Sequence, residues 1–289
     1  MNIICKINKK QPKSLMLDDG PLRLPPNGKE TNEFTLTVTD TAGRPVPKDK
    51  LTLKIEPINP NGPEWRSEDG VVNRYPQKAQ GNVRNKIREG LIRLLGTLDK
   101  NEVTTDENGI AKVIYRVSDI GGNESTIGQE KFTVTFSNGE SKQAIIEIGY
   151  DFLVEIPIID KGLQIDETAM GRYVHKDIAP ALIKLGEEVK KEGWKYPVTI
   201  TAGTLRWGGL YPPHSTHRTG EELDIRLMTC DGKGHKYTDC EYDREKTQLL
   251  VNKLIAAGAK TILFDDKSIT GVTQKPAFPH PDHLHASFK

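Results

Sequence analysis

Five of the seven histidines in this 289-residue sequence fall into two short clusters, at 214–217 and 280–285. Asp224 follows His217 by seven residues and lies in a strand-like stretch. Two neutral imidazoles and one carboxylate, with a fourth position left for water, form the ligand set of many catalytic zinc sites. We therefore expect His217, Asp224 and His285 to bind one zinc ion if the last strand lies beside the strand of Asp224.

Two plainer interpretations compete with a catalytic centre. The histidines can be ordinary surface residues, or they can form a purely structural zinc site. Three protein ligands accompanied by additional histidines suit catalysis better than a closed structural site. Gly220 lies between the first two predicted ligands, where the chain must turn tightly from a loop into the strand.

The histidine motifs resemble those of a known superfamily. Residues 217–224 fit H-x-x-G-x-x-x-D, and residues 283–285 fit H-x-H. Both motifs resemble the lysostaphin-type, D-Ala-D-Ala and hedgehog-like zinc metallopeptidases. With the run 206–217, the sequence looks most like the penicillin-insensitive murein endopeptidases. The resemblance spans roughly 201–288; the stretch 231–279 does not match, and the Glu221-Glu222 pair departs from the family pattern.

The resemblance implies roles for individual residues. In the family, the residues that match His217, Asp224 and His285 hold zinc. The histidines that match His214, His280 and His283 surround the site.

A zinc-bound water would need a proton-transfer partner. His283 is the first expectation, because it shares a strand face with His285 at a spacing of two. Asp282 is the alternative, because related carboxypeptidases and endolysins place a carboxylate there. A regular strand would turn Asp282 to the opposite face.

Three further residues are expected to contact a substrate. These are Arg206, His214 and His280. Arg206 would bind a substrate carboxylate, although a structural salt bridge explains an arginine there equally well.

The resemblance implies a zinc-dependent peptidoglycan hydrolase that cuts peptide cross-links, of the D,D-endopeptidase type. Neighbouring alternatives are a D,D-carboxypeptidase and an endolysin-like L-Ala-D-Glu peptidase. An alternative from another class is a non-catalytic surface or adhesin protein with a zinc-stabilised C-terminal domain. Peptidoglycan is the expected partner, and the first interpretation implies a secreted antibacterial effector that degrades the cell wall. A delivery machine or an immunity protein would then be a further partner.

Composition and charge exclude several other classes. The chain carries 41 Lys+Arg against 40 Asp+Glu, so its net charge of +1 argues against a nucleic-acid binder. No apolar run approaches the ~18–20 residues of a membrane helix. No apolar stretch of about 7–15 residues follows Met1, so we expect no secretory signal. Action in the periplasm or outside the cell would then require contact-dependent or other non-classical export, or release by lysis.

The length predicts two domains of different classes. Alternating stretches such as 34–39 and 51–55 predict a β-sandwich over 31–150. Its turns at 40–47 and 104–113 resemble those of bacterial Ig-like domains in invasin-type surface proteins. Residues 1–30 are expected to form a tail. For 151–289 we expect an α+β zinc metallopeptidase domain with a central antiparallel or mixed sheet.

A basic helical insertion is expected near 82–97. Val83, Ile87 and Leu91 recur there at helical spacing, among several arginines. The helix would either touch an anionic surface or pack on its own domain.

Two cysteines in the C-terminal half are candidates for a disulfide bond. Cys230 and Cys240 lie ten residues apart in a polar loop, and Cys5 stands alone. We expect the pair to lie within bridging distance, with Cα atoms about 4.4–6.8 Å apart, if the protein works outside the cytoplasm.

Overall fold

The computed structural model describes residues 2–7, 13–16, 22–58, 67–122, 126–277 and 279–289. The chain divides into two compact units, Met1–Tyr150 and Asp151–Lys289. Its described residues form many strands and few helices. Of the predicted fold, an Ig-like sandwich followed by an α+β zinc metallopeptidase domain, only the coarser part is confirmed: a mostly β chain that begins with an Ig-like sandwich.

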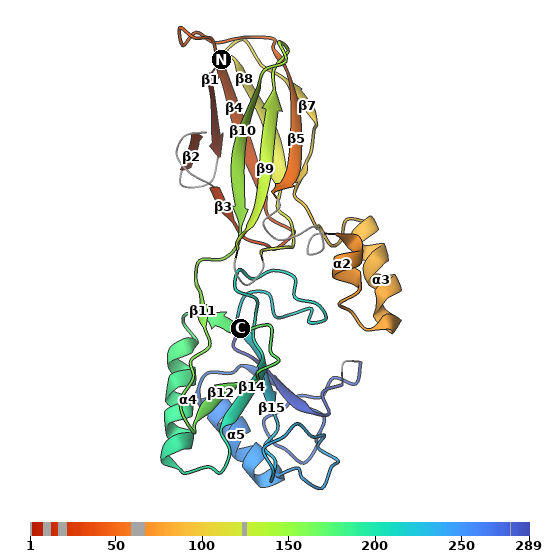
Figure 1. Ribbon diagram of the computed structural model, residues 1–289, viewed down its shortest axis with the longest axis vertical. Helices are drawn as coiled ribbons and strands as arrows, with labels where there is room; N and C mark the ends of the chain where they lie inside the picture. The colour runs from red at the N-terminus through yellow and green to blue at the C-terminus, as the bar shows by residue number, and fades with distance from the viewer. Residues whose placement is uncertain (1, 8–12, 17–21, 59–66, 123–125, 278) are drawn as a thin grey trace. The chain divides into compact units, whose positions relative to one another are not determined.

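The first unit contains two five-stranded sheets (Figure 1). One is antiparallel throughout, in the order β2 (Lys13–Met16), β1 (Asn2–Ile7), β4 (Thr31–Thr39), β8 (Ile110–Arg116) and β6 (Thr97–Leu98). The other runs in the order β3 (Leu22–Leu24), β10 (Ser141–Ile148), β9 (Gly128–Thr135), β5 (Lys50–Ile58) and β7 (Glu102–Thr104). Only the β3–β10 pair of this sheet is parallel.

The alternating residues of these strands build one core between the two sheets. Phe34 is fully buried, and its ring lies 5.2 Å from that of Tyr115 in the same sheet and 5.4 Å from that of Phe132 in the other. The Tyr115 hydroxyl donates to the buried Glu130 carboxylate at 2.8 Å. Period-two alternation thus places every second side chain in the core, as expected for a sandwich.

Residues 1–30 differ from the expected tail. They contribute β1, β2 and β3, with β1 paired to β4 and β3 paired to β10. Strand addition depends on backbone hydrogen bonds. A short segment with little hydrophobic patterning can therefore pair, and composition alone does not show it.

The helical insertion also differs in its bounds from the expected 82–97. It consists of α2 (Glu68–Val72) and α3 (Gln77–Arg88), and Gly90 follows α3 with a φ of +70°. Arg84 and Arg88 both form ion pairs with Glu68 of α2, at 2.5 and 3.0 Å. These contacts favour a helix that packs within its own unit over one that presents its arginines to an anionic surface.

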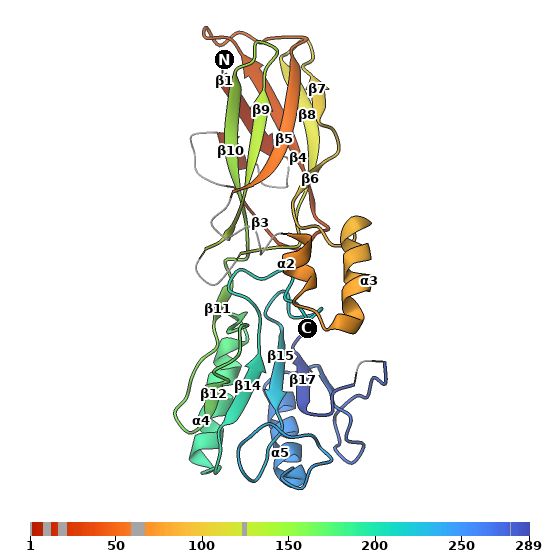
Figure 2. The same cartoon turned by 45° about the vertical axis from the view of Figure 1, so that its right-hand side comes forward.

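The second unit is built on one mixed sheet (Figure 2). Its strands lie in the order β12 (Leu163–Ile165), β14 (Val198–Ala202), β15 (Glu222–Arg226), β17 (His283–Ser287) and β16 (Thr261–Leu263). The β12–β14 pair is parallel and the other pairs are antiparallel. The unit also contains α4 (Ala179–Lys191), α5 (Arg244–Ala256) and the separate pair β11 (Leu153–Glu155) and β13 (Tyr173–His175).

Strands β15 and β17 each have one apolar and one polar face. Leu223 and Leu284 are fully buried in a core that also contains Leu182 of α4 and Leu250 of α5. The residues between the apolar ones point to the other face of the sheet. This alternation brings the acidic residues of β15 next to the histidines of β17.

Among the helices that the structure describes, none is long and apolar enough to span a lipid bilayer.

Cys230 and Cys240 are both exposed free thiols in the structure. An isolated antiparallel bridge joins Thr229 to Tyr242, and the Cys230 amide donates to the Glu241 carbonyl at 2.8 Å. The two ends of the loop are therefore held side by side, while the bridging distance between the cysteines stays a prediction.

We expect Cys230 and Cys240 to form an intramolecular disulfide when the protein is treated with oxidised glutathione. Two thiols would be oxidised as the reagent is reduced to two thiols, and the closed loop constrains the unfolded chain. Peptide mapping without reduction measures the linkage, with Cys5→Ser as a control that retains it. Linkage of either cysteine only to Cys5 or to glutathione would contradict the expectation.

Candidate metal centre

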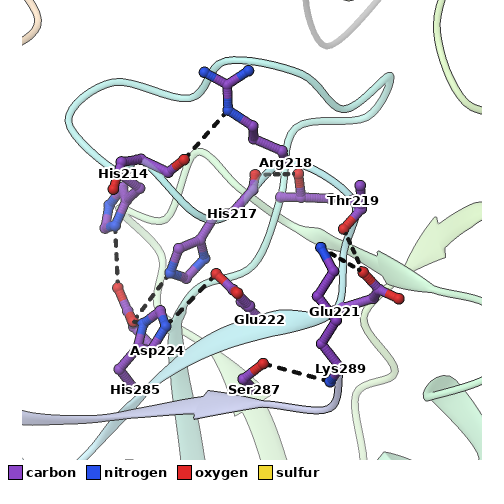
Figure 3. A network of polar contacts seen from close by, with 12 residues as sticks. His214, His217, Arg218, Thr219, Glu221, Glu222, Asp224, His285, Ser287 and Lys289 are labelled. Carbon is purple, nitrogen blue, oxygen red and sulfur yellow. Dashed lines mark hydrogen bonds and ion pairs between the residues drawn. The ribbon is translucent and has the colours of Figure 1, made fainter. Parts of the chain in front are cut away.

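The Asp224 carboxylate is the centre of the histidine cluster (Figure 3). Its Oδ1 lies 2.8 Å from His285 Nδ1 and 3.2 Å from His217 Nε2, and its Oδ2 lies 3.2 Å from His214 Nδ1. His283 Nε2 is farther away, at 3.7 Å from Oδ1. The structure thus brings the three predicted ligands together and adds His214 to them.

Strand register places two of these groups. Asp224 and His285 are direct partners in the antiparallel β15–β17 ladder, so their side chains share one face. Leu223 and Leu284 occupy the opposite face and are fully buried. The expectation that the last strand lies beside that of Asp224 therefore agrees with the observed register.

His217 comes from the loop before β15 and is fixed by two backbone contacts. Its ring Nδ1 lies 2.8 Å from the Gly203 carbonyl oxygen, and its own carbonyl accepts a hydrogen bond from Thr204 Oγ1 at 2.6 Å. A carbonyl only accepts, so Nδ1 carries the proton. In a neutral ring, Nε2 then presents a lone pair to Asp224.

Burial and the histidines act in opposite directions on the pKa of Asp224. Burial of the side chain raises that pKa, whereas the side-chain contacts with His214, His217 and His285 lower it. The pKa lies well below its ordinary value, so the group is a carboxylate at neutral pH. Metal binding requires this charged form.

A cavity of about 320 Å³ opens onto the cluster. His214, His217, Asp224 and His285 line it, and Lys275 adds a positive charge to its wall. The predicted ligands are thus reachable from solvent.

The residues expected to contact a substrate have different surroundings. The His280 ring packs 5.0 Å from that of His283 and 5.5 Å from that of His285, and its backbone amide donates to Asp265. Arg206 is absent from the described cavity lining and stacks on Trp207, with 5.1 Å between its guanidinium carbon and the ring centroid. His214, placed among the substrate contacts by the sequence, lies with His217 and Asp224 in a group that could hold a metal ion.

Asp282 does not point away from His283 as alternation predicts. Its Oδ1 lies 2.7 Å from His283 Nδ1. The strand begins at His283, so the alternation of β17 does not govern the residue before it. Strand alternation therefore does not separate Asp282 from His283, as the sequence predicted it would.

Sequence reasoning missed Glu222 as part of the cluster. Its Oε2 lies 3.6 Å from His285 Nε2, and the side chain is 13% exposed. Glu222 precedes Asp224 by two residues on β15, so period-two alternation was a signal that both share a face.

Comparison with known proteins does not return the predicted family. No family model matches the chain, and no curated protein matches it. A solved 282-residue C-terminal fragment of intimin, in complex with the intimin-binding domain of its translocated receptor, is 15% identical; the match covers 53% of this chain and 37% of that one, with a TM-score of 0.27. The D00-D0 domain of intimin is 12% identical over 51% of this chain and 48% of that one, with a TM-score of 0.28.

The adhesin InvE of Yersinia pseudotuberculosis is a third match. It is 8% identical, the match covers 99% of this chain and 69% of that one, and the TM-score is 0.33. Such identities and TM-scores leave no basis for transferring a function from these proteins to this chain.

These findings correct the main interpretation of the sequence. The predicted membership of the murein endopeptidase family is wrong, since no family model and no curated protein matches the chain. The prediction of a zinc metallopeptidase that hydrolyses the cell wall is corrected with it. His283 and Asp282 are therefore no longer assigned a catalytic role. Of the first interpretation, only the Ig-like domain is retained.

We expect Gly220→Ala to destabilise the second unit more than Gly193→Ala does. Both glycines have positive φ, +76° and +66°, so each alanine costs about 1–2 kcal/mol of backbone energy. At Gly220 a Cβ would also meet the His175 backbone nitrogen at 2.5 Å, whereas at Gly193 it meets nothing within 4 Å. Urea unfolding of both variants measures the difference, and equal losses would contradict the steric argument.

Proposed function

We propose that the chain is a non-catalytic surface protein whose second unit is stabilised by one bound zinc ion. The protein ligands are His214, His217, Asp224 and His285. The observation that carries the proposal is the pair of groups His217 Nε2 and Asp224 Oδ1, which lie 3.2 Å apart.

These two groups require a cation between or beside them. The Gly203 carbonyl holds the His217 proton on Nδ1, so neutral His217 and the Asp224 carboxylate present only lone pairs to each other. An extra proton on Nε2 or a metal ion removes this repulsion. Single donor atoms of His214, His217 and Asp224 lie within 4.8 Å of one another, which is close enough to hold a metal ion.

The donor types favour zinc over calcium or magnesium. Imidazole nitrogens predominate in the cluster, and they suit zinc, whereas calcium and magnesium prefer oxygen ligands. The ring centroid of His217 lies 4.7 Å from that of His214 and 5.1 Å from that of His285, so the three imidazoles surround one carboxylate.

The number of donors supports a structural site. Structural zinc is held by four protein ligands in a closed tetrahedral shell, whereas catalytic zinc keeps one position for water. Three imidazoles and one carboxylate supply four ligands here. With all four engaged, the ion stabilises the fold and leaves no position for a reacting water.

The turns of the first unit support a place on the cell surface. Asp40 Oδ1 accepts hydrogen bonds from the backbone amides of Ala42 and Arg44, both at 2.9 Å. Asp106 makes the same kind of turn with Asn108 and Ile110. These are the turns that resemble invasin-type surface domains, and peptidoglycan is the proposed contact of such a protein outside the cytoplasm.

We expect the purified protein to contain about one zinc ion per chain and the unfolding temperature of the second unit to fall when zinc is removed. Free zinc at 100 times its dissociation constant would stabilise the bound fold by about 2.7 kcal/mol. Metal analysis and calorimetry measure both effects. His217→Ala should lose the zinc, whereas His235→Ala, a histidine outside the cluster, should keep it.

The zinc content of wild type and of two ligand variants decides whether the zinc site exists. Wild-type protein without zinc, or equal zinc content in the His217→Ala and His285→Ala variants and wild type, would contradict it.

We expect zinc-loaded protein to sediment with purified peptidoglycan sacculi without releasing soluble fragments from them. A closed zinc shell has no water to activate, so binding should leave the material intact. Sedimentation and chromatography of the supernatant measure the two properties. Fragment release that requires zinc and disappears in His217→Ala would contradict the non-catalytic proposal, and failure to sediment would remove peptidoglycan as the contact.

A further inference from the structure

The imidazole of His285 lies between two carboxylates. Its Nδ1 is 2.8 Å from Asp224 Oδ1, and its Nε2 is 3.6 Å from Glu222 Oε2 (Figure 3). Strand geometry explains this placement, because Glu222 and Asp224 are two residues apart on β15 and His285 is the register partner of Asp224 on β17. The ring is therefore contacted by a carboxylate on each of its nitrogens.

Glu222 has a buried oxygen that needs a donor. Within the described part of the chain, its Oε2 is buried and has no hydrogen-bond partner. The neighbouring Glu221 takes the donors on its own side, Thr219 Oγ1 at 2.7 Å and Lys289 Nζ at 3.3 Å. A buried carboxylate without a donor is costly, and the Nε2 of His285 is the group placed to serve it.

We propose that Glu222 is a positioning residue that accepts the Nε2–H of His285 and so directs the Nδ1 lone pair toward the metal. A neutral imidazole has one N–H and one lone pair, so a carboxylate at Nε2 fixes the proton there and leaves Nδ1 for the ion. This inference rests on the proposed zinc site.

The tautomer of His217 is fixed in the same way, by a hydrogen-bond acceptor, but at the other ring nitrogen. The Gly203 carbonyl holds the proton of His217 on Nδ1 at 2.8 Å, which leaves Nε2 to face Asp224. One ligand is thus fixed through its Nδ1–H and the other through its Nε2–H. Both tautomers are therefore fixed before the ion binds. The lone pairs of His217 Nε2 and His285 Nδ1 then already face Asp224, where the ion would bind.

A direct metal ligand is the alternative role of Glu222. Single donor atoms of His217, Glu222 and His285 lie within 4.8 Å of one another, which is close enough to hold an ion. That arrangement would use Nε2 of His285 and would leave the 2.8 Å contact between Asp224 and Nδ1 outside the coordination shell. A conservative substitution separates the two roles, because a glutamine oxygen accepts a hydrogen bond but is a poor zinc ligand.

The test measures zinc affinity of the full chain by competition with a chromophoric chelator. Glu222→Leu should weaken zinc binding by about 10–100-fold, the usual effect of removing a group that orients a metal ligand. Glu222→Gln should restore most of the affinity. Glu221→Leu is the matched control and should bind zinc as wild type does.

A second measurement reads the tautomer directly. Nitrogen-15 spectra of the histidine rings in the zinc-loaded wild type should show His285 bound through Nδ1 with its proton on Nε2. This result does not depend on a variant that folds. His285 bound through Nε2, or Glu222→Gln as weak as Glu222→Leu, would overturn the positioning role.

The controls separate this inference from the zinc site on which it rests. Wild type that binds no zinc overturns both proposals. Wild type that binds one zinc, together with Glu222→Leu of unchanged affinity, overturns only the role of Glu222.

Discussion

The buried charge of Asp224 is the constraint on which the organisation of the second unit depends. Only 6% of its side chain is exposed, and an ionised carboxylate in such a place is stable only when donors or cations surround it. His214, His217 and His285 come from two separate parts of the chain to surround the carboxylate, and the proposed zinc ion supplies the positive charge. The loop before β15 and the end of the chain are therefore held together by one carboxylate.

Apolar and polar side chains alternate along β15 and β17, and this alternation places Asp224 and His285 on the same face of the sheet. On β15 and β17 the apolar residues Leu223, Ile225, Leu284 and Ala286 enter the core with α4 and α5. A shift of the strand register by one residue would bring the polar residues into the core and turn the apolar residues to solvent. Hydrophobic burial thus fixes the register that sets Asp224 opposite His285.

From the sequence we predicted Asp224 and His285 on their strands and His217 in the loop before β15, but His214 was placed with the substrate and Glu222 was left out. Asp224 and His285 were found from the clustering of the histidines and from the motifs H-x-x-G-x-x-x-D and H-x-H, and their strands then placed them side by side. The orientation of Asp282 was predicted wrongly because β17 starts one residue after it. The position of His214 was not predicted because it lies in a loop, and a loop has no periodic pattern from which its course can be inferred. Glu222 was visible in the alternation, but only the 3.6 Å contact with His285 gave it a role.

The spacing of ligands does not determine what a metal site does. The motif H-x-x-G-x-x-x-D follows from a loop, a glycine at φ +76° and a strand, and these place a histidine beside an aspartate whatever the ion then does. The difference between a reactive and a structural ion lies in the fourth ligand. Here His214 Nδ1 lies 3.2 Å from Asp224 Oδ2, closer to the carboxylate than His283 Nε2 at 3.7 Å. By this distance, His214 is the better placed of the two to complete the proposed shell.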